Sequence, residues 1–277
     1  MKNDTAKIYG LVGKDIKQSL SPAIFSYLFE AFKINGSYHP FPVNQKDFPN
    51  FMLQLKGRRI AGLNVTSPFK EKVLNFIENL DKKASQIGAV NLIKCDDGSL
   101  CGYNSDYVGV EKTLKRRLKV SSRLGTAVLI GAGGAARACF YVLKRLKCTT
   151  ITLANRDLSR YDGWFGLPHD KAETILLKQL PEYLNSTKVE VLINAASGSN
   201  SDIQECIQTA LGLGGKVFDL NYHCEYRIFP EFRDRYTDGL YMLVTQAAES
   251  FRVWTGKKAD VNQVHHYLAK SSGDRHA

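Results

Sequence analysis

The sequence predicts a protein of the α/β class with two α/β domains, and three observations support this prediction. Apolar runs short enough for buried strands alternate with longer amphipathic stretches typical of helices in both halves of the chain. A glycine-rich turn connects one of these apolar runs to a helical stretch near the middle of the sequence. The 277 residues, of which 44% are hydrophobic, are enough to form two cores of modest size.

The first half of the chain follows the order of an α/β domain. We expect strands at 8–13, 38–43 and 60–65, and helices at 22–32 and 48–55. The apolar runs 89–94 and 99–103 flank Asp96-Asp97-Gly98, which has turn chemistry and therefore predicts a β-hairpin. Pro68 favours a helix that begins there, because its missing N–H costs nothing in a first helical turn.

The second half of the chain begins with a helical stretch from residue 106 that ends in Lys115-Arg116-Arg117. We expect further strands at 128–130, 150–154, 189–194 and 216–220, and further helices at 137–146, 241–254 and 262–269. Residues 161–181 lack a clear periodicity, so we expect them to form mostly loop. The change of pattern predicts one domain of residues 1–105 plus 242–277 and a second domain of residues 106–241.

The glycine-rich turn has the spacing Gly-x-Gly-x-x-Ala between a strand and a helix, which is the fingerprint of a dinucleotide site in its required context. Gly131 permits the tight turn, Gly133 lets the backbone approach a pyrophosphate, and Ala136 allows close packing of the helix on the strand. A glycine turn without a ligand is the alternative. We predict a Rossmann-type domain whose cofactor contacts include Gly131, Ala132, Gly133, Gly134 and Ala135.

The residues after the next strand bear on which dinucleotide binds. An NAD enzyme usually places an acidic residue there, against the ribose 2′-hydroxyl. This chain has Asn155 and Arg156, with Arg160 close behind, and guanidinium groups suit the 2′-phosphate of NADP. Asp157 would repel that phosphate, so we predict NADP and keep NAD as a possible cofactor.

Composition limits the other classes of function. The formal net charge is +11, but the Lys and Arg residues are scattered and no nucleic-acid-binding motif accompanies them, so we expect no nucleic-acid partner. The six cysteines show no Cys-x-x-Cys pair and no His at zinc-finger spacing, so we expect no metal. No apolar run is long enough to span a bilayer, so we expect no membrane partner. Reduced thiols suit a cytoplasmic protein.

Two polar segments follow predicted strands of the first half. The segment Asn64-Val65-Thr66-Ser67-Pro68-Phe69-Lys70 sets an amide, a hydroxyl and an ammonium group at a strand end, where α/β enzymes keep their chemistry. The alternative is that this segment has no catalytic role, with Thr66 as a helix cap and Lys70 as a solvated surface residue. Ser19 and Ser21 precede a helix, where Ser21 is a candidate N-cap with Pro22 at the first helical position, and the two hydroxyls could hold a carboxylate.

Seven motifs in order along nearly the whole chain together resemble the shikimate dehydrogenase family. Each motif alone is modest evidence, whereas seven at plausible spacing make a specific match. The motifs are Ser19-Leu20-Ser21-Pro22, Asn64-Val65-Thr66-x-Pro68-x-Lys70, Gly88-Ala89-Val90-Asn91, Asn104-Ser105-Asp106, Gly131-x-Gly-Gly-x-Ala136, Asn155-Arg156 and Gly239-Leu-Tyr-Met-Leu-Val-x-Gln246-Ala247-Ala248.

The resemblance implies reversible reduction of 3-dehydroshikimate to shikimate with NADPH, in a cleft between two α/β domains, as a step of aromatic amino acid (chorismate) biosynthesis. A monomer or homodimer is expected. The implied catalytic pair is Lys70 and Asp106. The implied substrate residues are Ser19, Ser21 and Tyr222 at the carboxylate and Asn64, Thr66, Asn91 and Gln246 around the ring hydroxyls, and Gly239 is implied at the cofactor.

The chain departs from the family pattern at several places. Ser105 replaces the usual Thr, Asp157 stands where Thr is common, and residues 223–228 lack the usual Pro and Thr. A quinate/shikimate dehydrogenase using NAD is therefore an alternative, although Ser21 favours shikimate where a Thr would favour quinate. A non-catalytic metabolite sensor on the same fold is a second alternative, against which Lys70 and Asp106 argue.

Overall fold

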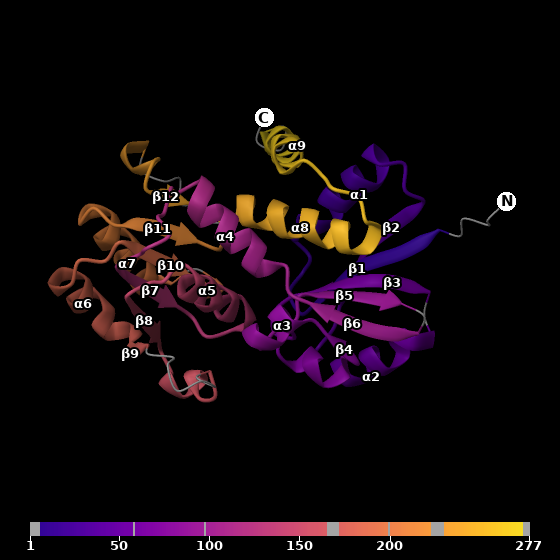
Figure 1. Cartoon of the computed structure of the whole chain (residues 1–277), viewed down its shortest axis with the longest axis horizontal. Helices are drawn as coiled ribbons and strands as arrows, with labels where there is room; N and C mark the ends of the chain where they lie inside the picture. The colour runs from indigo at the N-terminus through magenta and orange to yellow at the C-terminus, as the bar shows by residue number, and fades with distance from the viewer. Residues whose placement is uncertain are drawn as a thin grey trace. The chain divides into compact units, whose positions relative to one another are not determined.

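The computed structural model describes residues 6–57, 59–96, 98–164, 172–198, 200–222 and 230–273. The chain divides into two compact units, one of Met1–Gly109 with Leu243–Ala277 and one of Val110–Met242. Each unit contains a six-stranded sheet with helices packed against it (Figure 1). The predicted α/β class is therefore confirmed.

The sheet of the first unit has the strand order β2-β1-β3-β5-β6-β4. Strands β1, β2 and β3 are parallel, and β5 and β6 form the predicted antiparallel hairpin beside them. Because Asn64 pairs with Leu92 and Leu92 pairs with Tyr103, the ends of β3 and β6 meet the start of β5 at one edge of the sheet. The bounds are β1 (Lys7–Gly13), β2 (Gly36–Pro42), β3 (Ile60–Val65), β4 (Asn79–Leu80), β5 (Leu92–Asp96) and β6 (Ser99–Tyr103).

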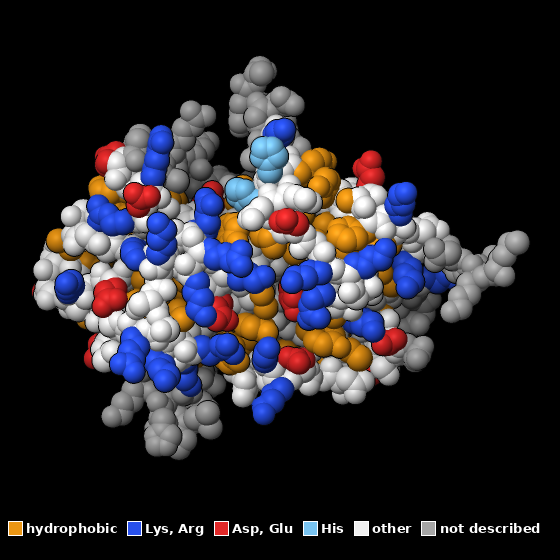
Figure 2. Space-filling model, turned by 45° about the horizontal axis from the view of Figure 1, so that its top comes forward, with side chains coloured by type: hydrophobic (Ala, Val, Ile, Leu, Met, Phe, Trp, Pro, Cys, Tyr) orange, Lys and Arg blue, Asp and Glu red, His pale blue; other side chains and the backbone are white. Residues whose placement is uncertain are grey.

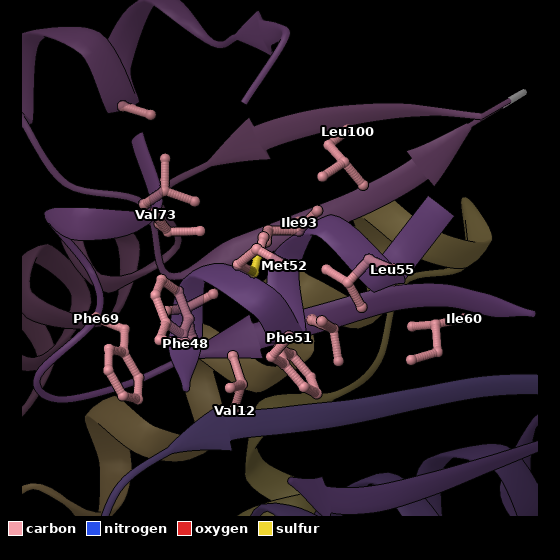
Figure 3. Packing of buried hydrophobic residues seen from close by; sticks show 14 residues of the cluster. Val12, Phe48, Phe51, Met52, Leu55, Ile60, Phe69, Val73, Ile93 and Leu100 are labelled. Atoms are coloured by element: carbon pink, nitrogen blue, oxygen red, sulfur yellow. The ribbon is translucent and has the colours of Figure 1, made fainter. Parts of the chain in front are cut away.

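An aromatic and aliphatic core packs against this sheet (Figure 3). Phe48, from α2 (Phe48–Leu53), stacks on Phe69 with ring centroids 4.0 Å apart. Both rings are fully buried, and burial of such aromatic area stabilises the fold strongly. The core fixes the turn after β3, because Phe69 lies between Thr66 and Lys70 in that turn.

A second group of aromatic residues joins α1 (Ser21–Ala31) and α8 (Leu240–Thr255) to the sheet. Trp254 contacts Phe25, with ring centroids 5.1 Å apart, and donates a hydrogen bond from Nε1 to the carbonyl of Ile93 at 2.9 Å. A Cβ at Gly62 would overlap the indole of Trp254, so glycine is required there for close packing. Helix α9 (Val261–Gly273) packs on α1 through Tyr27 and Tyr267.

The sheet of the second unit is entirely parallel and has the order β12-β11-β10-β7-β8-β9. This is the Rossmann order, in which the connections reverse direction between β7 and β10. The strands are β7 (Thr126–Ile130), β8 (Thr150–Asn155), β9 (Glu173–Leu176), β10 (Val191–Asn194), β11 (Lys216–Asp219) and β12 (Tyr236–Thr237). The helices are α4 (Asp106–Arg116), whose first turn belongs to the first unit, α5 (Gly134–Arg145), α6 (Leu180–Ser186) and α7 (Ser201–Gly212).

Two helix starts differ from the prediction. The Ser67–Pro68 peptide is cis, and Phe69 N–H donates to the carbonyl of Thr66 at 2.9 Å, so Pro68 lies in a tight turn rather than in a helix. The next helical element is the 3₁₀ helix η2 (Lys72–Phe76). In α1, Leu20 is the N-cap and makes no side-chain cap bond, so the predicted capping role of Ser21 is wrong.

The segment 161–181 is also more regular than predicted. Its described residues contain the edge strand β9, the 3₁₀ helix η4 (Leu177–Gln179) and the start of α6, while 165–171 lie outside the described residues. A four-residue strand that pairs on one side only leaves little periodicity to detect. The short helix α3 (Lys82–Ile87) was not predicted either, although the Asp81 side chain caps it and Gly88 ends it with φ 70°.

Charged side chains are spread over the face of the molecule that Figure 2 shows. Figure 2 shows Lys and Arg on many parts of the visible face, with acidic side chains among them. Within the described residues, no helix has both the length and the apolar character needed to cross a bilayer.

Candidate active site

Lys70 and Asp106 form a partly buried ion pair in the first unit. Lys70 lies in the turn after β3, and Asp106 is the first residue of α4, directly after β6. The distance from Lys70 Nζ to Asp106 Oδ2 is 2.7 Å, and the side chains are 14% and 4% exposed. A carboxylate in the first turn of a helix is stabilised by the helix dipole. Because its side chain is only 14% exposed and is paired with Asp106, Lys70 is not the solvated surface residue that the alternative interpretation assumed.

Asn91 holds the other oxygen of the same carboxylate. Its Nδ2 donates to Asp106 Oδ1 at 2.7 Å and to Ser105 Oγ at 3.0 Å, while its Oδ1 accepts from Ser105 N–H at 2.6 Å. Asn91 lies just before β5, where the sheet register brings it to the end of β6. Both oxygens of Asp106 are engaged, so the orientation of the carboxylate is fixed before any ligand binds.

A buried polar network continues from Asn91 to helix α8. Ser105 Oγ donates to Gln246 Oε1 at 3.3 Å, and Ser250 Oγ donates to the Gln246 carbonyl at 3.0 Å. Asn64 Nδ2 donates to Ser250 Oγ at 2.9 Å. Buried amides and hydroxyls are stable only when hydrogen-bonded, which this network achieves. The structure thus brings the predicted residues Asn64, Lys70, Asn91, Asp106 and Gln246 together.

Two further members of this network were not predicted. Tyr38, on β2, donates from its hydroxyl to Asn64 Oδ1 at 3.0 Å. Ser250 follows Gln246 by four residues, which places it on the same helix face. That spacing in Gln246-Ala-Ala-Glu-Ser250 is the sequence signal that would have identified Ser250. Tyr38 has no comparable signal, because its contact depends on the register of β2 in the sheet.

Ser19 and Ser21, predicted to hold a carboxylate, follow β1 in the chain, and Thr66, predicted to bind a ring hydroxyl, directly follows β3. Ser21 is buried and its N–H donates to Ser19 Oγ at 3.2 Å. Thr66 is half-buried, and its N–H donates to the carbonyl of Val12 at 2.9 Å. A Cβ at Gly13 would overlap the Thr66 methyl group, so the backbone of β1 and the Thr66 side chain pack tightly.

The glycine turn of the second unit has the geometry of a pyrophosphate site. Gly131 has φ 104°, and a Cβ there would come within 2.9 Å of the Ala196 nitrogen. Gly133 is the N-cap of α5, makes no side-chain cap bond, and would have no atom within 4 Å of an added Cβ. Open space therefore lies beside Gly133, at the positive N-terminal end of α5. These residues fit a dinucleotide phosphate.

The loop after β8 carries the two predicted arginines. Arg156 and Arg160 are exposed, and Asn155 Oδ1 accepts from Arg156 N–H at 2.7 Å. Asp157 Oδ1 accepts from the N–H and hydroxyl of Ser159, at 3.0 and 2.7 Å, and caps the 3₁₀ helix η3 (Leu158–Tyr161). The Asp157 carboxylate therefore has a structural role in the loop, which reduces its availability to a ribose hydroxyl.

The carboxyl end of β11 contains another cluster, around Asp219. This buried carboxylate accepts hydrogen bonds at Oδ1 from Asn194 Nδ2 and from the N–H and Nδ2 of Asn221. Burial raises the pKa of Asp219 above its usual 3.8, while the bonds from Asn221 and Asn194 act in the opposite direction. Gly239 N–H donates to the Asn221 carbonyl at 3.3 Å, and a Cβ at Gly239 would overlap the Leu220 carbonyl.

Tyr222 belongs to the second unit and is half-buried just past β11. The other predicted substrate residues lie in the first unit. The departures expected at residues 223–228 lie outside the described residues. Among the residues that the structure does describe, no group of three or more His, Cys, Asp or Glu is arranged to hold a metal ion.

Comparisons with known proteins agree with this geometry. Residues 11–93 match the family model of the shikimate dehydrogenase substrate binding domain, and residues 239–266 match that of the shikimate 5'-dehydrogenase C-terminal domain. The chain is 36% identical over 268 residues to shikimate dehydrogenase (NADP(+)) of Pyrococcus furiosus, which covers 94% of each chain. It is 34% identical to the Caldanaerobacter subterraneus enzyme of the same name, covering 96% of this chain and 98% of that one. The crystal structure of shikimate dehydrogenase 1 from Peptoclostridium difficile has a TM-score of 0.82 at 28% identity, covering 95% of this chain and 97% of that one.

Proposed function

Because the chain belongs to the shikimate dehydrogenase family, we propose that it catalyses the reversible NADPH-dependent reduction of 3-dehydroshikimate to shikimate. The observation that carries the proposal is the partly buried pair of Lys70 and Asp106, with Nζ and Oδ2 2.7 Å apart and Asn91 bound to the second carboxylate oxygen. Oxidation of a secondary alcohol requires a group that takes the hydroxyl proton, and this pair supplies one.

The catalytic roles follow from the contacts of the pair. NADP, when bound, would supply the hydride acceptor for oxidation of the alcohol carbon and, as NADPH, the hydride donor for reduction of the carbonyl carbon. During reduction the Lys70 ammonium gives a proton to the carbonyl oxygen, and during oxidation the neutral amine takes the hydroxyl proton back. Asp106 accepts a hydrogen bond from Lys70 Nζ and so orients that side chain, and we propose that it also accepts a hydrogen bond from a substrate hydroxyl. Because Asn91 and Lys70 fix the carboxylate beforehand, little reorganisation is needed when the substrate binds.

The substrate residues have distinct proposed partners. The amides of Asn64, Asn91 and Gln246 and the hydroxyl of Thr66 bind the ring hydroxyls. Ser19 and Ser21 bind the carboxylate near the N-terminus of α1, and Tyr222 assists them. A site lined by buried amides rejects a ring that lacks the matching hydroxyl, because the amides would lose a hydrogen bond.

The cofactor is proposed to bind the second unit as NADP. Gly131, Ala132, Gly133, Gly134 and Ala135 hold the pyrophosphate through backbone N–H groups. Arg156 and Arg160 hold the 2′-phosphate, since both residues are exposed and their guanidinium groups can reach a ligand. Asn155 supports this loop by accepting a hydrogen bond from the Arg156 N–H. Gly239 lets the backbone approach the cofactor closely. NADP is preferred over NAD, because the Asp157 carboxylate is bound by Ser159.

The two units are proposed to divide the work. The first unit, Met1–Gly109 with Leu243–Ala277, binds the substrate, and the second unit, Val110–Met242, binds the dinucleotide. We propose a monomer or homodimer without a nucleic-acid partner. A cytoplasmic location is proposed because the five described cysteines, Cys95, Cys101, Cys139, Cys148 and Cys206, are reduced thiols.

A panel of substrates and cofactors tests the proposal. Purified protein is assayed with 3-dehydroshikimate, shikimate and quinate, each with the NADP and NAD forms of the cofactor, and ligand binding is measured in parallel. The expected result is turnover of shikimate and 3-dehydroshikimate with a preference for NADP. Preference for quinate with NAD would assign the alternative dehydrogenase activity. Binding of both ligands without any turnover would assign a metabolite sensor.

A further inference from the structure

The hydroxyl group of Tyr161 lies beneath the glycine turn. Tyr161 is only 2% exposed, and its hydroxyl is a donor to the carbonyl of Gly131 at 3.2 Å and to that of Ala154 at 3.0 Å. Gly131 N–H also donates to the Ala154 carbonyl at 3.0 Å. One phenol therefore connects the turn after β7 to the end of β8.

The orientation of the Gly131 carbonyl determines the orientation of the next N–H. The carbonyl of Gly131 and the N–H of Ala132 belong to one planar trans peptide, in which the two bonds point in opposite directions. Glycine at φ 104° has more rotational freedom than other residues, so this peptide needs an external restraint. A hydrogen bond that holds the carbonyl toward Tyr161 directs the Ala132 N–H to the opposite side of the turn.

The ring of Tyr161 is itself held in place. Trp164 packs against it at 90°, with ring centroids 5.1 Å apart, and the guanidinium of Arg137 lies 4.8 Å from the Trp164 ring centroid. Arg137 belongs to the first turns of α5. Burial raises the pKa of Tyr161 above its usual 10, and a side-chain hydrogen bond with Asn155 opposes this only in part, so the phenol remains a hydrogen-bond donor throughout the neutral and mildly alkaline range.

We propose that Tyr161 is a positioning residue for the dinucleotide: its hydroxyl fixes the peptide between Gly131 and Ala132, so that the Ala132 N–H is presented to the pyrophosphate. This inference rests on the proposed function, because it requires that the glycine turn binds NADP. It adds to the dinucleotide site a residue that the Gly-x-Gly-x-x-Ala pattern does not contain. This residue lies at the end of η3, in the segment that follows β8.

Tyr161→Phe tests this role because it removes only the hydroxyl oxygen. Tyr183→Phe is a matched control, because it also removes a tyrosine hydroxyl that contacts β8. The Tyr183 hydroxyl lies 2.8 Å from the Oγ1 atom of Thr152, and Thr152 is the β8 residue two positions before Ala154. The dissociation constant of NADPH is measured by fluorescence titration, and kcat and both KM values by steady-state assay. Circular dichroism establishes that each variant is folded at the assay temperature.

We expect Tyr161→Phe to weaken NADPH binding by roughly three- to tenfold, the factor that corresponds to one hydrogen bond. The KM for shikimate should stay within about twofold of the parent value, since the turn does not touch the substrate in this proposal. Tyr183→Phe should leave NADPH binding within the same limit. A folded Tyr161→Phe protein that binds NADPH like the parent, or equal weakening in both variants, would overturn the proposal.

The same experiment separates this inference from the proposed function. If the parent protein binds no NADPH and does not oxidise shikimate, the proposed function fails and the role of Tyr161 fails with it. If the parent is active and only the expected difference between the two variants is missing, the proposed function stands and the role of Tyr161 alone is wrong.

Discussion

Asn64 and Ser250 are 186 residues apart in the sequence, yet the Asn64 side-chain amide donates a 2.9 Å hydrogen bond to the Ser250 hydroxyl. The contact joins the end of β3 to the middle of α8. It fixes the direction in which Asn64 presents its amide, because Tyr38 holds the amide oxygen at the same time. Helix α8 is thus part of the site through Ser250 as well as through Gln246.

Ser250→Ala should disturb substrate binding more than it disturbs the fold. Loss of the hydroxyl leaves the buried Asn64 amide short of one acceptor, at a cost of about 1–3 kcal/mol, partly offset by the better helix propensity of alanine. We expect a several-fold rise in the KM for shikimate with a smaller change in kcat. Steady-state kinetics and urea unfolding measure the two effects.

Thr255→Ala provides the comparison for Ser250→Ala. Thr255 Oγ1 also donates to the carbonyl four residues earlier in α8, that of Phe251, at 2.7 Å. Its loss should lower the free energy of unfolding without raising the KM for shikimate. If both variants raise this KM equally, Ser250 acts only through the stability of the helix.

Lys70→Ala should lower kcat by about 10²–10⁴-fold, the usual contribution of general acid–base catalysis, with a smaller change in the KM for shikimate. Asp106→Asn should lower kcat as well, because the neutral amide no longer pairs with the Lys70 ammonium. Since the two groups act as one unit, the double variant should be little worse than Lys70→Ala. Fully additive losses in kcat would show that the two residues act independently.

The sequence predicts features that depend on local order along the chain. The Gly131 turn between a strand and a helix is such a feature, and so is the position of Asn64 and Lys70 after a buried strand. Both are encoded within a few neighbouring residues, where propensity and spacing carry the information. The parallel sheet of the second unit agrees with the same alternation of strands and helices, whereas its strand order is seen only in the structure.

Other features depend on contacts that a single sequence does not show. The hydroxyl of Tyr161 reaches Gly131 because η3 folds back beneath the turn, and nothing in the residue spacing indicates this. Pro68 illustrates the opposite case, since its local preference for a helix start is overridden by the turn that buries Phe69. Tertiary packing decided both outcomes, and the local pattern contained neither.

Arg156→Gln should distinguish the two dinucleotides. Removing the exposed guanidinium deletes a charge-assisted contact with the 2′-phosphate, so the KM for NADPH should rise by roughly tenfold while the KM for NADH changes little. Asp157→Thr should act in the other direction, because it removes a negative charge beside the phosphate and keeps a hydroxyl able to cap η3. Equal changes for NADPH and NADH in both variants would place the 2′-phosphate elsewhere.

Asp219→Asn should change how stability depends on pH. Burial raises the pKa of Asp219 in the folded chain above the usual 3.8. At pH values between the ordinary pKa of the unfolded chain and the raised pKa of the folded chain, the folded chain binds more protons than the unfolded chain. The free energy of unfolding therefore falls as pH rises through this range. Above the raised pKa the full penalty of the buried charge is present. The hydrogen bonds from Asn194 and Asn221 reach Oδ1, which an asparagine oxygen can replace.

The variant should therefore gain stability relative to the parent as the pH rises from 4 to 7. Urea unfolding of both proteins at several pH values in this range measures the difference, in which the titration of all other groups cancels. The expected curve rises from pH 4 and becomes level once the parent carboxyl group is fully ionised. If the free energy of unfolding of the variant instead falls relative to that of the parent as pH increases, the Asp219 charge stabilises the fold. The hydrogen bonds to the carboxylate would then outweigh the cost of its burial.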